Sequence, residues 1–107
     1  MGFVVLTFKI KHGEAGHRVD NFSLSAPDYL EEKLIRDAKQ FVGVELTKDE
    51  VTEEFSAPAI PLHLLLDLIK SHGYKFQCVT TAAYPGTTTM VRQYVFEDPN
   101  EVVWSLN

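Results

Sequence analysis

The stretch Leu64–Thr80, "LLLDLIKSHGYKFQCVT", changes its hydrophobic period at a single glycine. Before Gly73 the apolar residues recur with helical spacing, and the polar residues between them fall on the opposite face. After Gly73 large residues alternate with polar ones, as they do along a β-strand. Gly73 itself is suited to the left-handed conformation that ends many helices. The stretch therefore predicts a helix, a stop and a strand, with Tyr74, Phe76, Cys78 and Thr80 on one side of the strand.

A second strand follows this first one closely. The segment "AAYPGTTT" (82–89) has the composition of a turn, and "TMVRQYVFED" (89–98) returns with strand-like residues. The two strands are predicted to form an antiparallel hairpin. The last ten residues, 98–107, are expected to form either a short extra strand or a tail that docks through Trp104.

The first half of the chain predicts a strand, a loop and a helix. Residues Phe3–Ile10 are β-branched or aromatic on both faces, which is typical of a central or interface strand. Residues 11–23 contain two glycines and many charges without a clear period, so we expect a loop. Ser25, Pro27 and Asp28 form a helix start, and the helix is predicted from about Ala26 to Gln40, ending at Gly43. Its expected apolar stripe consists of Tyr29, Leu30, Leu34 and Phe41.

Between the two helices the signals conflict. Alternation favours a strand over Glu50–Ser56, and Pro61 suits the first turn of the second helix. The predicted order is β-α-β-α-β-β. We therefore expect an α+β fold in one domain, residues 1–107, with a mainly antiparallel sheet and two helices on one face. The other face would expose Phe3, Val5 and Val91, so we expect copies of the chain to assemble through it.

Composition excludes several classes of partner. The net charge of −5 and the pI near 5.2 argue against nucleic acid and against an anionic membrane, because both bind clustered Lys and Arg. The N-terminal apolar run is too short to span a bilayer, for which roughly 20 residues are needed. The single cysteine, Cys78, cannot form an internal disulfide; we expect it to be buried and the protein to be cytoplasmic.

The residues capable of chemistry form no recognisable catalytic or metal-binding pattern. The four histidines, His12, His17, His63 and His72, lack metal-ligand spacing on a shared helix face. The serines lack the context of a nucleophile elbow, and adjacent acidic pairs point to different faces. We therefore expect no metal and no cofactor. The glycine of the "YPGTTT" turn leaves two interpretations open, a plain hairpin turn or backbone N–H groups that bind an anion.

The order of these pieces resembles the GTP cyclohydrolase I feedback regulatory protein family. The pieces that carry the resemblance are "FVVLTFKIK" (3–11), "SAPDYLEEKL" (25–34), "LLLDLIKSHGYK" (64–75), "VTTAAYPGTTTMV" (79–91) and "FED" (96–98). The resemblance implies a non-enzymatic homopentamer that binds GTP cyclohydrolase I. It also implies inhibition by tetrahydrobiopterin and activation by phenylalanine, with phenylalanine bound where the regulator and the enzyme meet.

The resemblance further implies an effector site. The matching positions are the end of the first strand and the hairpin turn, namely Lys9, Ile10, Lys11, Thr87, Thr88 and Thr89. Thr88 stands about where the family has a glutamine amide, and the segment 98–107 has no counterpart. Two alternatives stay open: an amino-acid-binding module of the ACT type, and a small dimeric α+β barrel enzyme. Five subunits would favour the regulator, and two would favour either alternative.

Overall fold

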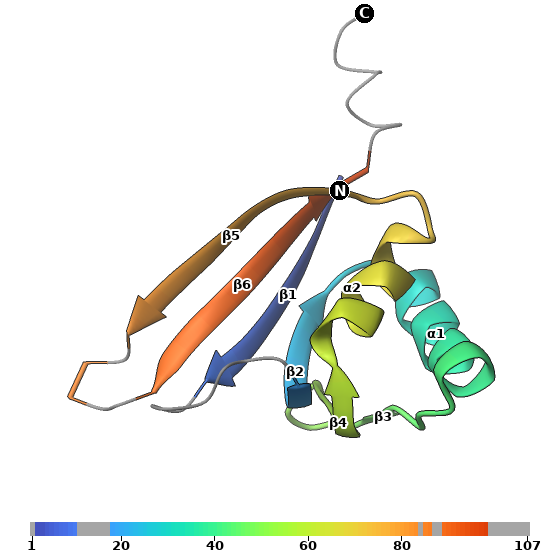
Figure 1. Ribbon diagram of the computed structural model, residues 1–107, viewed down its shortest axis with the longest axis horizontal. Helices are drawn as coiled ribbons and strands as arrows, with labels where there is room; N and C mark the ends of the chain where they lie inside the picture. Colours follow the sequence, from blue (N-terminus) through green and yellow to red (C-terminus); the bar gives the residue numbers. More distant parts are fainter. Residues whose placement is uncertain (1, 11–17, 84, 87–88, 99–107) are drawn as a thin grey trace, which may run out of the picture.

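The computed structural model describes residues 2–10, 18–83, 85–86 and 89–98. In this part of the chain a six-stranded antiparallel sheet carries two helices on one face, so the α+β prediction is confirmed (Figure 1). The strands lie in the order β3-β4-β2-β1-β6-β5. The elements, in chain order, are β1 (Phe3–Ile10), β2 (Arg18–Ser25), α1 (Asp28–Asp37), the π-helical turn η1 (Ala38–Val42), β3 (Thr47–Lys48), β4 (Glu54–Pro61), α2 (Leu62–Lys70), β5 (Lys75–Ala83) and β6 (Met90–Glu97).

The predicted order of elements was wrong at β2 and β3. Residues 18–23, expected to be loop, belong to strand β2, which lies between β1 and β4. The strand was missed because an irregularity between Val19 and Asn21 breaks its alternation: Val19 and Phe22, both buried, are three residues apart. Strand β3 has only two residues and carries no period of its own.

The first helix lies where the sequence placed it. Helix α1 continues directly into η1, and the chain leaves the helix at Gly43, whose φ of 75° is left-handed as predicted. Leu30 and Leu34 are buried, but Tyr29 is exposed and Phe41 is 71% exposed. The expected apolar stripe was therefore wrong at its two aromatic ends. The wider π turn over Ala38–Val42 carries Phe41 off the core-facing stripe.

Strand β4 begins and ends later than predicted, at Glu54 and Pro61 instead of Glu50 and Ser56. Pro58 is tolerated within β4 because β3 pairs only with Phe55 and Ser56, so Pro58 lies beyond that short neighbour. Pro61 is the N-cap of α2, one position before the first turn in which it was expected. Gly73 has a φ of 91°, which confirms the left-handed stop before β5.

One hydrophobic core lies between the helices and the sheet. Residues Val4, Leu6, Phe8 and Ile10 of β1 point into it, and Leu30, Leu34, Leu65, Leu68 and Ile69 of the helices cover them. The rings of Phe22 and Phe55, on neighbouring strands, are stacked with centroids 5.2 Å apart. The opposite face of the sheet, here called the open face, carries Phe3, Val5, Val91 and Val95, of which Phe3 is half exposed. None of these four belongs to the core.

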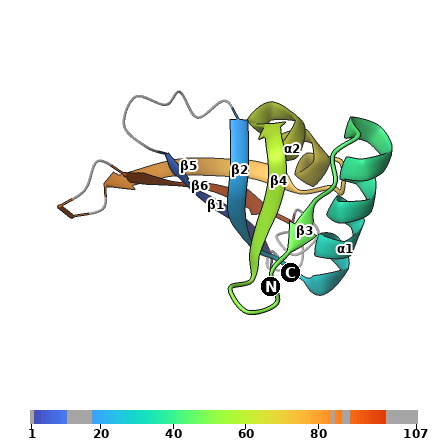
Figure 2. The same cartoon turned by 90° about the horizontal axis from the view of Figure 1, so that it is seen from below.

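The predicted hairpin of β5 and β6 is confirmed, and it extends beyond the helices (Figure 1). Figure 2 shows that the sheet is strongly twisted, with β5 and β6 running across the direction of β2 and β4. The prediction that Cys78 is buried was wrong, because Cys78 is exposed. A bulge between Phe76 and Cys78 moves Cys78 to the open face, opposite Val95, and puts Val79 on the helix side, opposite Tyr94.

No helix in the described ranges is long and apolar enough to cross a bilayer. The expected extra strand or tail falls within residues 99–107, which lie outside the described residues.

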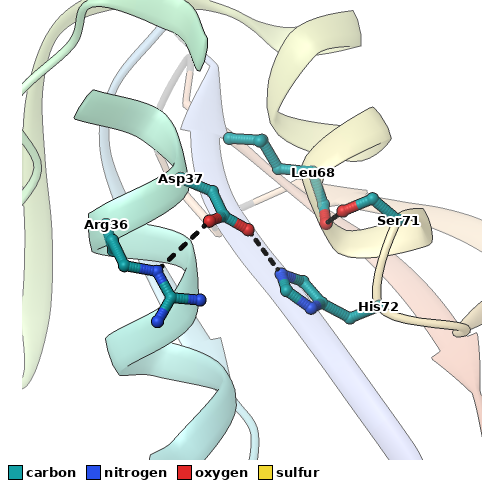
Figure 3. A network of polar contacts seen from close by, with 5 residues as sticks. All are labelled: Arg36, Asp37, Leu68, Ser71 and His72. Atoms are coloured by element: carbon teal, nitrogen blue, oxygen red, sulfur yellow. Dashed lines mark hydrogen bonds and ion pairs between the residues drawn. The ribbon is translucent and has the colours of Figure 1, made fainter. Parts of the chain in front are cut away.

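The end of α1 is tied to the turn before β5 by a polar contact that the sequence did not reveal (Figure 3). Asp37 is the only charged residue buried in the described part of the chain, and its Oδ2 lies 2.9 Å from Nε2 of His72. Its Oδ1 lies 3.5 Å from Nε of Arg36. Ser71, beside His72, donates from its hydroxyl to the carbonyl of Leu68 at 2.6 Å. These contacts hold the α2–β5 turn against α1.

Replacing Asp37 by alanine should lower the free energy of unfolding by about 1–3 kcal/mol, because it leaves the half-buried His72 ring without its partner. Urea denaturation followed by circular dichroism measures the change. Asp67→Ala, which removes an exposed carboxylate from α2, is the matched control and should change stability by less than about 0.5 kcal/mol. Equal effects of the two substitutions would show that the Asp37–His72 contact does not stabilise the fold.

Candidate ligand groove on the open face

A groove opens on the open face where strands β1 and β2 separate. The two strands pair only over Val5–Thr7 and Ser23–Ser25. Beyond Thr7, strand β1 continues to pair with β6 as far as Ile10, whereas β2 pairs with β4. The groove between them has a volume of about 430 Å³. It is lined by Thr7, Phe8, Lys9, Arg18, Val19, Asp20, Asn21, Ser23, Glu54, Thr89 and Val91.

Charges of both signs line the groove, and the strand register places them along its length. Glu54 is opposite Ser23, whose other neighbour is Thr7, so it lies at the closed end where the strands meet. Lys9 lies two residues beyond Thr7, and Arg18 begins β2, so both cations lie toward the open end. Asp20, two residues after Arg18, lies toward the open end as well. The closed end therefore carries one carboxylate, and the open end carries both cations and the second carboxylate.

Two hydrogen bonds fix the walls of the groove. Arg18 donates from Nη1 to the carbonyl oxygen of Ala59 at 3.0 Å, which anchors its guanidinium to β4. Ser56 donates from its hydroxyl to Oδ1 of Asn21 at 2.9 Å. Both bonds join β2 to β4 on the side of the groove away from β1.

The structure places the site residues predicted from the sequence in three groups. Lys9 and Thr89 both line the groove, because the pairing of Ile10 with Met90 brings the end of β1 beside the start of β6. Ile10 itself is 2% exposed and points into the core on the other face, so its side chain does not reach the groove. Lys11, Thr87 and Thr88 lie outside the described residues.

Sequence reasoning missed Arg18, Asp20 and Glu54. The first two were assigned to a loop, and Glu54 was placed in a strand whose neighbour was unknown. Recognising β2 would have supplied the missing signal, since its alternation from Asn21 to Ser25 is regular: Phe22 and Leu24 are buried, and the residues beside them are exposed.

A second hollow of about 440 Å³ lies on the same face, between β1 and the β3–β4 loop. Its main polar contact is an ion pair in which Nζ of Lys48 donates to Oε2 of Glu31 at 2.8 Å. This hydrogen bond to Glu31 raises the pKa of the Lys48 ammonium. In the adjoining loop, N–H groups of Thr52 and Val51 donate to Asp49 and lower the pKa of its carboxyl. The Lys48 side chain thus takes part in the ion pair with Glu31 that holds β3 against α1.

The described residues that line the groove provide groups that can bind a small polar ligand. They include two cations, two carboxylates, hydroxyl groups and an apolar surface from Val91, and no cysteine or histidine is among them. Within the described residues no group of three or more His, Cys, Asp or Glu side chains is arranged to hold a metal ion.

Comparison of the sequence with models of known protein families and with curated proteins finds no match.

Proposed function

We propose that this chain is a non-enzymatic cytoplasmic regulatory protein that binds an amino acid in the groove and passes the effect to a partner enzyme. The observation that carries the proposal is the groove with Glu54 at its closed end and Lys9 and Arg18 toward its open end, which Thr89 also lines. The resemblance of the sequence to the feedback regulators names the partner, GTP cyclohydrolase I, and the effectors, phenylalanine for activation and tetrahydrobiopterin for inhibition.

The charges of the groove are complementary to a free amino acid. An α-carboxylate placed toward the open end meets Lys9 and Arg18, and an α-ammonium placed toward the closed end meets Glu54. The volume of about 430 Å³ falls in the ~300–1,000 Å³ range of small-molecule sites. Val91 is the one apolar side chain of the open face among the described lining residues, so the apolar wall is smaller than an aromatic side chain needs. A partner that covers the open face would complete the wall for an aromatic side chain.

The open face supports assembly into a closed ring, for which the resemblance indicates five subunits. Phe3, Val5, Val91 and Val95 present apolar surface on a side of the sheet that no described helix covers. Contacts between copies would remove this surface from water. The groove lies on the same face, so effector binding and subunit or enzyme contacts would share one surface.

Co-precipitation with GTP cyclohydrolase I, with and without phenylalanine, tests the proposal. We expect the enzyme to be retained and phenylalanine to increase the amount retained. Phenylalanine binding without any retention of the enzyme would favour the ACT-type module instead. If the enzyme is not retained and phenylalanine does not bind, the proposal is wrong.

Lys9→Glu should weaken phenylalanine binding by about tenfold or more, since it replaces an attractive charge at the open end of the groove by a repulsive one. Calorimetry with phenylalanine, in the presence of the enzyme, measures the change. Lys39→Glu makes the same substitution on the exposed surface of η1 and should leave the affinity unchanged. If both variants bind as the native protein does, the carboxylate of the ligand does not lie near Lys9.

A further inference from the structure

Strand β5 forms an outer edge of the sheet, and beyond its bulge at Gln77 this edge lacks the usual protection. Within the described part of the chain it pairs with β6 alone, and all nine of its residues are exposed. From Phe76 to Ala83 it contains no charge and no proline. Natural sheets commonly block such edges with charged residues, prolines or very short strands, because an unpaired strand edge can bind another strand. An edge of this length and composition can accept a further strand.

The opposite edge of the sheet is protected in these ways. Strand β3 has two residues, and β4 beyond it contains Pro58 and Pro61, neither of which has a backbone N–H to donate. Head-to-tail pairing of β5 with this edge of another copy is therefore blocked. The remaining way for the sheets of two copies to pair is strand β5 of one copy against strand β5 of the other.

We propose that β5 pairs antiparallel with β5 of a second copy across a two-fold axis and joins the two sheets into one. The bulge at Gln77 interrupts the strand, so the regular segment available for pairing is Cys78–Ala83. Residues that face each other in an antiparallel pair lie on the same side of the sheet. Two registers pair five residues of this segment, one centred on Thr80 and one on Thr81. The hydroxyl of Thr81 already accepts a hydrogen bond from Nε of Arg92 at 3.3 Å, so the proposed register is the one centred on Thr80. It places Thr80 opposite Thr80, Val79 opposite Thr81 and Cys78 opposite Ala82.

This register brings together side chains that are compatible. Opposed threonines are a favourable cross-strand pair, and no like charges meet. Lys75, the one charged residue of β5, is opposite Glu97 within its own sheet and lies outside the paired segment. On the helix side, Val79 and Phe76 are 46% and 41% exposed, because the helices do not cover this part of the sheet. The added strand gives Val79 a new neighbour there.

The pairing is separate from the proposed ring, because it uses the edge of the sheet and not the open face. Where a ring forms as well, pairing at β5 joins two rings and doubles the mass. Where no ring forms, the protein is a dimer.

Charge substitution at the two-fold axis tests the pairing. Thr80→Lys and Thr80→Glu each place like charges opposite each other, so each variant alone should lose half of the native mass by light scattering. An equimolar mixture places Lys opposite Glu and should restore the native mass. Thr47→Lys, on the protected edge, should leave the mass unchanged. A native mass that persists in Thr80→Lys, or a mixture that fails to restore it, would overturn the pairing.

The single cysteine provides a second test on the native chain. In the proposed register the two Cys78 residues lie roughly 14 Å apart on one face, from a rise of ~3.4 Å per residue and a strand spacing of ~4.8 Å. A bismaleimide of this span should link native subunits into covalent dimers, and Thr80→Lys should abolish the product. Val5→Lys, which should disrupt only the ring, should leave the cross-link intact. Failure of the native protein to cross-link would overturn the pairing whether or not the ring forms.

Discussion

Phe22→Ala should lower the free energy of unfolding by about 3–5 kcal/mol. Phe22 is 1% exposed, and its ring is stacked on Phe55 with an angle of 2° between the two planes. Truncation removes this contact and leaves a cavity between β2 and the helices. Since domains are commonly stable by only about 5–15 kcal/mol, the loss would be a large part of the total. Urea denaturation of the native protein and the variant gives the difference.

Phe41→Ala is the control for this substitution. It removes the same ring from η1, where 71% of the residue is exposed, and should change stability by less than about 0.5 kcal/mol. A loss for Phe22→Ala as small as that for Phe41→Ala would show that Phe22 does not lie in the core as described.

Val5→Lys should dissociate the ring while leaving the subunit folded. Val5 lies on the open face, between Val95 of β6 and Ser25 of β2, and outside the core that β1 forms with the helices. A lysine there remains in water in the isolated subunit but must be desolvated in an interface, which costs several kcal/mol. Light scattering at micromolar concentration should therefore show a large fall in mass, with an unchanged circular dichroism spectrum.

The control for Val5→Lys is Val51→Lys, which makes the same substitution in the exposed loop between β3 and β4. It should leave the mass unchanged. Loss of the fold in Val5→Lys would place Val5 in the core instead, and an unchanged mass would mean that the open face is not the interface.

The sequence predicts those elements whose signals are local. Helix α1, helix α2 and the β5–β6 hairpin each combine a clear period with a glycine or proline at a boundary. Gly43 and Gly73 end the helices in the left-handed conformation that only glycine adopts at little cost. Such signals depend on a few neighbouring residues, so they are readable without knowledge of the fold.

Elements that depend on distant neighbours were missed or misplaced. The bulges at Asp20 and Gln77 shift the alternation of β2 and β5, which hid one strand and reversed the face expected for Cys78. Pro58 is acceptable in β4 because β3 is too short to reach it and the pairing with β2 is irregular at that point. The Asp37–His72 contact joins residues 35 positions apart, and neither residue alone indicates it.

Only part of the candidate site was predicted, because some of its residues also depend on strands that are distant in the sequence. Lys9 and Thr89 come from a resemblance in sequence order, and the β1–β6 pairing brings both to one groove. Arg18 and Asp20 required strand β2, which was not recognised. Ile10 was included because the resemblance places the end of the first strand in the effector site, but alternation along β1 directs its side chain into the core.

The most direct measurement is calorimetry of phenylalanine binding to the isolated protein and to its complex with GTP cyclohydrolase I. Because the groove has charges for both ends of an amino acid but little apolar wall, we expect weak binding to the isolated protein and tighter binding to the complex. By thermodynamic linkage, phenylalanine must tighten the complex by the same factor. Equal affinity for phenylalanine in the isolated protein and in the complex would contradict the proposed regulatory role.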